Sequence, residues 1–172
     1  MNCVLNKKTR GNNVVSAVWN LAQPIANALE LDLWDVKFVK EGPEYYLRIF
    51  IDSDSKITLD DCEKMSRAID KPLDELDPIV QSYCLEVCSP GINRELSRDE
   101  HLEKFIGHKI IVRLIRPFED GTKELICVLE AFNKNEITVS CCDNCNDFCD
   151  SSKQLCILRK NIAFIKLDDF DD

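Results

Sequence analysis

Glycine and histidine are scarce in this chain, and their spacing excludes several kinds of site. The only five glycines lie far apart, at Gly11, Gly42, Gly91, Gly107 and Gly121. Loops that cradle phosphate need glycines a few residues apart, so a P-loop, a dinucleotide-binding fingerprint and the GXXG clamp of a KH domain are excluded. Neither His101 nor His108 shares a motif with a candidate nucleophile. We therefore expect no catalytic residue, no enzymatic activity and no small-molecule substrate.

Long hydrophobic runs are also missing. No apolar run approaches the roughly 20 residues that a membrane-spanning helix needs. The polar start of the chain, residues 1–13, lacks the apolar stretch of a signal peptide. The sequence thus predicts a cytoplasmic protein that does not associate with membranes. Its ten cysteines should mostly be thiols, because the cytoplasm keeps thiols reduced.

Charge is plentiful but unbalanced. The chain has 22 Lys and Arg against 31 Asp and Glu, a formal net charge of −9. Residues 1–92 hold 10 basic and 15 acidic side chains, and residues 93–172 hold 12 and 16. Nucleic-acid binding depends on clustered Lys and Arg, so this balance argues against a bare nucleic-acid binder. An acidic surface is better matched to a basic protein partner.

Two segments in the first half have the apolar spacing of helices. Residues 13–31 place apolar side chains on one helical face, with Pro24 expected to kink or tighten the second half. Thr58 is a candidate N-cap for a second helix, in which Leu59 belongs to the apolar stripe. Pro72 should end that helix or distort it nearby.

Short segments with period-two alternation predict strands throughout the chain. In the first half they are residues 34–40, 45–52 and 83–88. With the two helices, they predict an α+β domain of order α-β-β-α-β, in two layers with the helices on one sheet face. In the second half, a short helix at 99–106 precedes strands at 108–116, 123–132, 136–141, 153–158 and 163–167. Five short strands joined by tight turns predict a small closed barrel.

Ser89-Pro90-Gly91 separates the two halves and is followed by Arg94. Proline pre-sets φ and glycine accepts a positive φ, so Pro90-Gly91 predicts a sharp type II turn. We interpret Ser89, Pro90, Gly91 and Arg94 as an interdomain linker with a possible role in partner binding. A solvated charge is an equally good account of Arg94, because exposed ion pairs are weak.

Four stretches of the chain resemble the ribosome maturation factor RimP family. They are residues 33–42, residues 47–52 followed by 57–62, residues 83–96 (which contain the Ser-Pro-Gly turn) and residues 101–107. The resemblance implies an α/β domain at 1–92, a linker at 93–98, and an SH3-like (Sm-like) barrel at 99–172 that ends in an acidic tail. It also implies a non-enzymatic factor that binds the immature small ribosomal subunit and assists docking of ribosomal protein S-twelve. Glu95 stands where the family usually has proline, which predicts a less rigid linker.

The segment from Cys141 to Cys156 departs from the family pattern and is rich in cysteine. Cys142 and Cys145 have the spacing with which two thiolates bind one Zn²⁺, and Cys149 and Cys156 could complete the site. The second Cys-x-x-Cys pair is missing, so a loop lengthened by small polar residues explains the segment as well. We therefore expect no cofactor, and keep a structural zinc as the alternative.

Tyr46, Arg48 and Phe50 share one face of a predicted strand, and two roles are open to them. They could form a platform on which bases stack, or pack against protein. The acidic charge favours contact with protein. Basic residues at 113, 116, 123, 159 and 160 could touch ribosomal RNA once the protein is docked. An alternative function is that of an Sm-like RNA-binding regulator acting off the ribosome, which the acidic charge disfavours.

Overall fold

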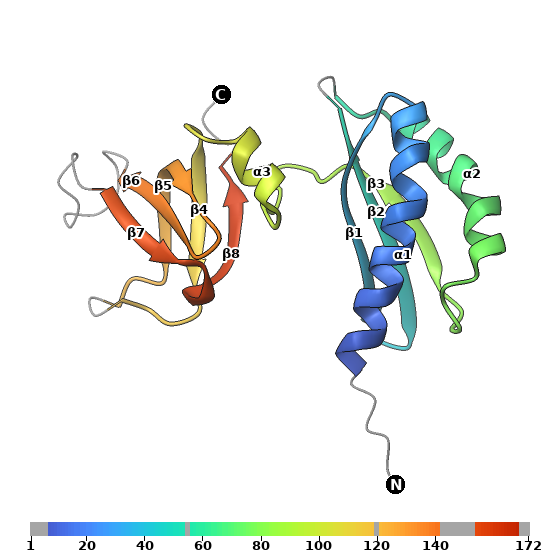
Figure 1. The fold of residues 1–172 in the computed structure, drawn as a ribbon, viewed down its shortest axis with the longest axis horizontal. Helices are drawn as coiled ribbons and strands as arrows, with labels where there is room; N and C mark the ends of the chain where they lie inside the picture. Colours follow the sequence, from blue (N-terminus) through green and yellow to red (C-terminus); the bar gives the residue numbers. More distant parts are fainter. Residues whose placement is uncertain (1–6, 54–55, 119–120, 142–153, 169–172) are drawn as a thin grey trace, which may run out of the picture. The chain divides into compact units, whose positions relative to one another are not determined.

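The computed structural model describes residues 7–53, 56–118, 121–141 and 154–168 (Figure 1). The chain divides into two compact units, Met1–Pro90 and Gly91–Asp172, which we call the N-terminal unit and the C-terminal unit. A search of the described helices finds none with the length and apolar character needed to cross a membrane.

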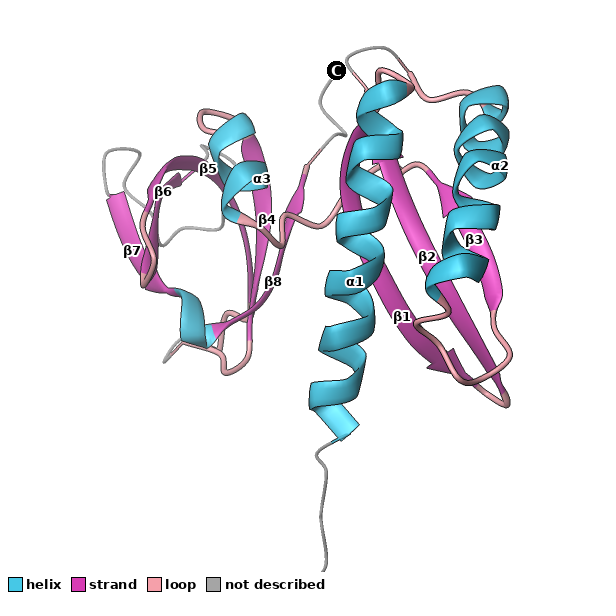
Figure 2. Ribbon diagram, turned by 45° about the vertical axis from the view of Figure 1, so that its right-hand side comes forward, coloured by secondary structure: helices cyan, strands magenta, loops and turns pink. Residues whose placement is uncertain are grey.

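The N-terminal unit is a three-stranded sheet with two helices on one face (Figure 2). Its elements are α1 (Lys7–Ala28), β1 (Asp32–Glu41), β2 (Glu44–Asp52), α2 (Leu59–Leu76) and β3 (Cys84–Cys88). In the order β1-β2-β3, the first pair is antiparallel and the second is parallel. A parallel pair needs a crossover connection, and α2 supplies it. The predicted α-β-β-α-β order is confirmed.

The core of this unit lies between the helices and the sheet. Leu47, Ile49 and Ile51 of β2 are completely buried, because period-two alternation points them all toward the helices. Val18 of α1 and Met65 of α2 are equally buried against them. Helix α1 begins at Lys7, earlier than predicted, and runs through Pro24 to Ala28.

Helix α2 begins as predicted and ends later. The hydroxyl of Thr58 accepts a hydrogen bond from the backbone N–H of Asp61, and the Asp61 carboxylate accepts one from the Thr58 N–H. The helix does not end at Pro72 but continues to Leu76. Burial of the apolar residue after Pro72 offsets the one hydrogen bond that proline cannot make. Leu59, predicted to lie on the buried stripe, is instead 90% exposed.

The C-terminal unit is a short helix followed by a five-stranded antiparallel sheet. Its elements are α3 (Asp99–Lys104), β4 (Lys109–Leu114), β5 (Glu124–Phe132), β6 (Glu136–Cys141), β7 (Gln154–Leu158), the 3₁₀ turn η1 (Arg159–Asn161) and β8 (Ile162–Leu167). The strand order is β7-β6-β5-β4-β8. The prediction of a β-rich second half with five short strands is confirmed.

The predicted closure of this sheet is wrong. In the part of the chain that the structure describes, no ladder joins β7 to β8. Strand β4 pairs with one edge of β8, and residues 94–96 pair with the other edge along Ile165 to Leu167. The N–H of Leu96 donates to the carbonyl of Ile165 (2.8 Å), and the N–H of Leu167 donates to the carbonyl of Arg94 (3.0 Å).

Candidate functional site

The Ser-Pro-Gly turn marks the boundary between the two units, which falls between Pro90 and Gly91. Gly91 has a φ of 74°, the left-handed conformation that the third position of a type II turn requires. A Cβ added at Gly91 would meet nothing within 4 Å. Glycine is therefore needed here for its backbone conformation and not for space.

Residues 93–98, interpreted from the sequence as a linker, are part of the C-terminal unit. Leu96 is 3% exposed, and Glu95 forms an isolated bridge with Lys166 of β8. The backbone hydrogen bonds of this segment to β8 hold it in place, whether or not position 95 is proline. Arg94 therefore belongs to an ordered extension of the C-terminal sheet.

Tyr46, Arg48 and Phe50 lie on the sheet face opposite the helices, because they alternate with the buried residues of β2. Arg48 occupies the middle of this face. Its Nη1 and Nη2 donate to the two oxygens of Glu41 (2.6 and 3.0 Å), and its Nε donates to Glu86 (2.6 Å). These hydrogen bonds lower the pKa of the Glu41 carboxyl and raise the pKa of Arg48. The guanidinium is thus already neutralised from two sides.

Tyr46, one of the two aromatic residues of this face, is also bound within the unit. The Tyr46 hydroxyl donates to Glu44 (2.7 Å), which raises the pKa of Tyr46. The Arg48 guanidinium lies 5.1 Å from the centre of the Tyr46 ring. A base stacking on this ring would have to displace Arg48, and a phosphate would meet carboxylates. The geometry favours protein contact over RNA stacking for this face.

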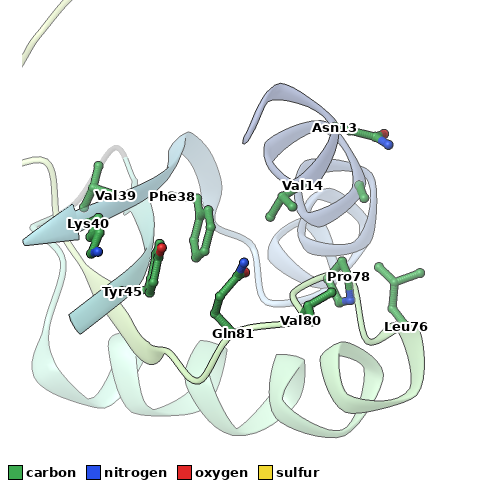
Figure 3. Close-up of a pocket in the computed structure, with 11 residues that line it drawn as sticks. Asn13, Val14, Phe38, Val39, Lys40, Tyr45, Leu76, Pro78, Val80 and Gln81 are labelled. Atoms are coloured by element: carbon green, nitrogen blue, oxygen red, sulfur yellow. The ribbon is translucent and has the colours of Figure 1, made fainter. Parts of the chain in front are cut away.

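An apolar groove, which the sequence did not predict, lies at the far end of the β1–β2 hairpin (Figure 3). Its volume is about 1120 Å³. The rings of Phe38 and Tyr45 stack with centroids 5.5 Å apart, and Val14 of α1 and Val80 of the α2–β3 connection also line it (Figure 3). Val80 is 96% exposed. We call this surface the acid-rimmed groove, for the carboxylate of Asp77 beside it.

One charged residue belongs to the described lining of this groove, the cation Lys40, whose Nζ lies 5.3 Å from the centre of the Tyr45 ring. Asp77 lies between two lining residues, Leu76 and Pro78, whereas the Glu44 carboxylate accepts from Tyr46 on the opposite face of the sheet. Both carboxylate side chains belong to exposed residues. The groove is open because β3 pairs with β2 only from Tyr46 to Phe50, so the end of the hairpin projects past β3. An apolar floor with Asp77 at its edge suits a partner segment that places apolar side chains on the floor and a basic side chain beside Asp77.

A second groove, of about 650 Å³, lies in the C-terminal unit. It runs between the β4–β5 connection and the end of β7 with η1. Its lining includes the cations Arg116 and Lys160 and the partly exposed apolar residues Ile115, Phe118 and Leu158. We call it the basic groove. Arg116 and Lys160 were among the basic residues that sequence reasoning proposed for RNA contact.

Of the four candidate zinc ligands, only Cys156 lies among the described residues. Cys142, Cys145 and Cys149 lie outside the described residues. Cys156 is exposed on β7, with its Sγ 3.8 Å from the Thr138 hydroxyl. Among the residues that the structure describes, no group of three or more potential ligands could hold a metal. The structural zinc therefore stays a prediction.

Two compact units, each with an open groove, define a protein whose surfaces are suited to binding partners. The N-terminal unit, which carries the acid-rimmed groove, is also the part of the chain that matches a known protein family. Residues 21–93, from within α1 to just past the Ser-Pro-Gly turn, match the model of the RimP N-terminal domain. This match supports the RimP family, which is a family of ribosome maturation factors and not a known enzyme family. The resemblance seen in the sequence is confirmed.

Proposed function

We propose that this protein is an assembly factor for the small ribosomal subunit, which it binds in the immature state, and that it assists docking of ribosomal protein S-twelve. The observation that carries the proposal is the RimP N-terminal domain match over residues 21–93. The family associates with ribosome maturation, and the small subunit is the assembling particle that the sequence resemblance indicates. The protein would work in the cytoplasm, by binding and without chemistry of its own.

The acid-rimmed groove is the surface we assign to the protein partner. Ribosomal proteins are basic, and residues 1–92 have five more acidic than basic side chains, 15 against 10. Complementary charge speeds encounter, and a buried apolar contact then supplies most of the affinity. The exposed Val80 side chain is the apolar contact that a partner can cover with least rearrangement.

For the C-terminal unit we propose an SH3-like fold. Its five short antiparallel strands and the order β7-β6-β5-β4-β8 support this assignment. The missing β7–β8 ladder makes it an open version of the barrel predicted from the sequence. The 3₁₀ turn η1 connects β7 to β8.

Maturation would proceed by differential binding. A factor can favour one arrangement of its target only by binding that arrangement more tightly than the alternatives. Tighter binding to the immature subunit than to the finished one would promote docking of S-twelve and then release the factor. No energy source is required for this cycle.

Sucrose-gradient fractionation of a cell lysate, with detection of this protein, tests the proposal. We expect the protein in the fractions of free small subunits, and a build-up of precursor ribosomal RNA when it is deleted. Absence from free small subunits together with normal precursor levels would overturn the assembly role. A regulator acting off the ribosome would instead be recovered on RNA alone, with a steep dependence on salt.

A further inference from the structure

The basic groove has walls that backbone hydrogen bonds hold in place. The N–H of Ile115 donates to the carbonyl of Asn161 (2.8 Å), which joins the end of β4 to η1. The N–H of Phe118 donates to the carbonyl of Thr122 (2.9 Å), which closes the β4–β5 connection on itself. The groove is therefore formed before any partner arrives, which lowers the entropic cost of binding.

Its charge is opposite in sign to that of the whole chain. Of the described residues that line the groove, Arg116 and Lys160 are charged and none is acidic. Neighbouring cations are bound elsewhere. Arg159 donates to Asp99 (2.6 Å), and Arg113 lies 3.4 Å from Glu124. The described lining of the groove thus carries two cations and no carboxylate, in a protein of net charge −9.

Apolar side chains lie partly uncovered between these cations. Ile115 is 56% exposed, and Phe118 and Leu158 are each 39% exposed. An aromatic ring beside two cations offers a stacking surface together with contacts for phosphate. Single-stranded RNA presents both groups at once, because its unstacked bases are separated by phosphates.

We propose that the basic groove binds a single-stranded segment of ribosomal RNA, with a base stacked on Phe118 and phosphates on Arg116 and Lys160. The inference rests on the proposed role in small-subunit assembly. There the possible partners are basic proteins, which Arg116 and Lys160 repel, and RNA, which they attract. The protein therefore meets the two components of its target with different units.

An NMR titration of the full chain with an unstructured oligoribonucleotide tests this assignment. We expect the backbone amides of Ile115, Phe118 and Leu158 to shift. An acidic peptide with apolar side chains, added separately, should shift them less. Unmoved groove amides with RNA, or a larger effect of the peptide, would overturn the proposal. Because this readout uses the unmodified protein, it does not depend on how any variant folds.

Variants then separate stacking from charge. Phe118→Ala should weaken RNA binding about tenfold through the lost stacking. Lys160→Ala should reduce the slope of log K against log salt by about 0.7, the value for one phosphate contact on a single strand. Lys134→Ala removes the same charge from an exposed turn outside the groove and should change neither quantity. Equal effects of Lys134→Ala and Lys160→Ala would contradict the groove as the site.

Co-sedimentation of the unmodified protein with immature small subunits is measured in parallel. If the protein binds the subunits but RNA leaves the groove unmoved, the RNA assignment fails and the assembly role stands. If RNA moves the groove amides but the protein does not bind the subunits, the assembly role fails and the RNA site stands.

Discussion

The two grooves of this protein differ in the charges around them. The acid-rimmed groove has one lining cation, Lys40, and Asp77 beside its apolar floor, whereas the basic groove has two cations, Arg116 and Lys160, between exposed apolar side chains. Both halves of the chain are acidic, so the positive groove arises from local pairing and not from composition. A particle made of basic proteins and RNA offers a partner for each.

A similar contrast holds between two arginines, Arg48 on strand β2 and Arg116 in the β4–β5 connection. Arg48 makes three hydrogen bonds to two carboxylates, at 2.6 to 3.0 Å. Arg116 lies in a groove with no acidic residue among its described lining. Both were candidate contacts at the level of sequence. The number of carboxylates around an arginine decides its role. An arginine bound by carboxylates is structural, whereas one without them can bind phosphate.

The largest expected effect is on stability, from a substitution that destabilises one unit and leaves the other unchanged. Leu47→Ala should destabilise the N-terminal unit by about 2–5 kcal/mol, because it leaves a cavity at a completely buried position. Both tryptophans, Trp19 and Trp34, belong to this unit. Tryptophan fluorescence during urea unfolding therefore reports on it alone.

Leu129→Ala is the matched control, a completely buried leucine of β5 in the C-terminal unit. It should leave the midpoint of the tryptophan transition unchanged and lower the midpoint seen by circular dichroism. A shift of the tryptophan transition as large as that of Leu47→Ala would mean that the units unfold together. That result would contradict the description of the two units as independent.

A second prediction concerns a substitution that disrupts the acid-rimmed groove and keeps the fold. Val80→Glu should weaken binding to purified S-twelve at least about tenfold, because it removes the exposed apolar contact and leaves a charge to be buried under the partner. Leu59→Glu makes the same change at another exposed position of the N-terminal unit, 90% exposed at the start of α2, and should leave binding unchanged. Fluorescence anisotropy with labelled S-twelve measures both.

RNA binding provides the second comparison for these variants. Neither Val80→Glu nor Leu59→Glu should alter it, because the basic groove belongs to the other unit. Loss of S-twelve binding in both variants would show that added charge, and not the groove, is responsible.

The smallest expected effect concerns a helix cap. Thr58→Ala should cost about 1 kcal/mol at pH 7 in the tryptophan-detected unfolding of the N-terminal unit. Thr58→Ser, which keeps the hydroxyl, should cost less. The C-terminal helix α3 has no side-chain hydrogen bond at its cap residue, so it offers no equivalent interaction to remove.

The pH dependence of this effect has a definite sign. Hydrogen bonds from the Thr58 hydroxyl and backbone N–H lower the pKa of the Asp61 carboxyl in the folded state. Their contribution is complete above the unfolded pKa of about 3.9 and disappears as the pH falls through the lower folded value. The difference between wild type and Thr58→Ala should therefore shrink between pH 7 and pH 3. A difference that stays constant would exclude a role for the carboxylate.

Local features of the fold could be predicted because neighbours in the sequence cause them. The Thr58 cap, the β1–β2 hairpin and the buried alternation of Leu47, Ile49 and Ile51 each depend on residues a few positions apart. The prediction for Pro72 used its intrinsic preference, whereas burial of Leu73 in the tertiary structure favours continuation of the helix.

The candidate sites could be predicted only in part. Arg116 and Lys160 were identifiable as basic residues, but their groove forms from segments about forty residues apart in the chain. The acid-rimmed groove gave no signal at all, because it results from a hairpin that extends past its neighbouring strand. The pairing of residues 94–96 with β8, more than sixty residues later, likewise has no local signature.

The sequence by itself determined the order of helices and strands, the acidic balance and the family. Periodicity, caps and turn residues act over one or two turns of chain, so they can be recognised without a structure. Only the tertiary structure decided which arginine is neutralised, where apolar side chains stay exposed and why the second sheet stays open. Those outcomes depend on distances between residues far apart in the chain, and charge or exposure has meaning for a partner only after the fold has set these distances.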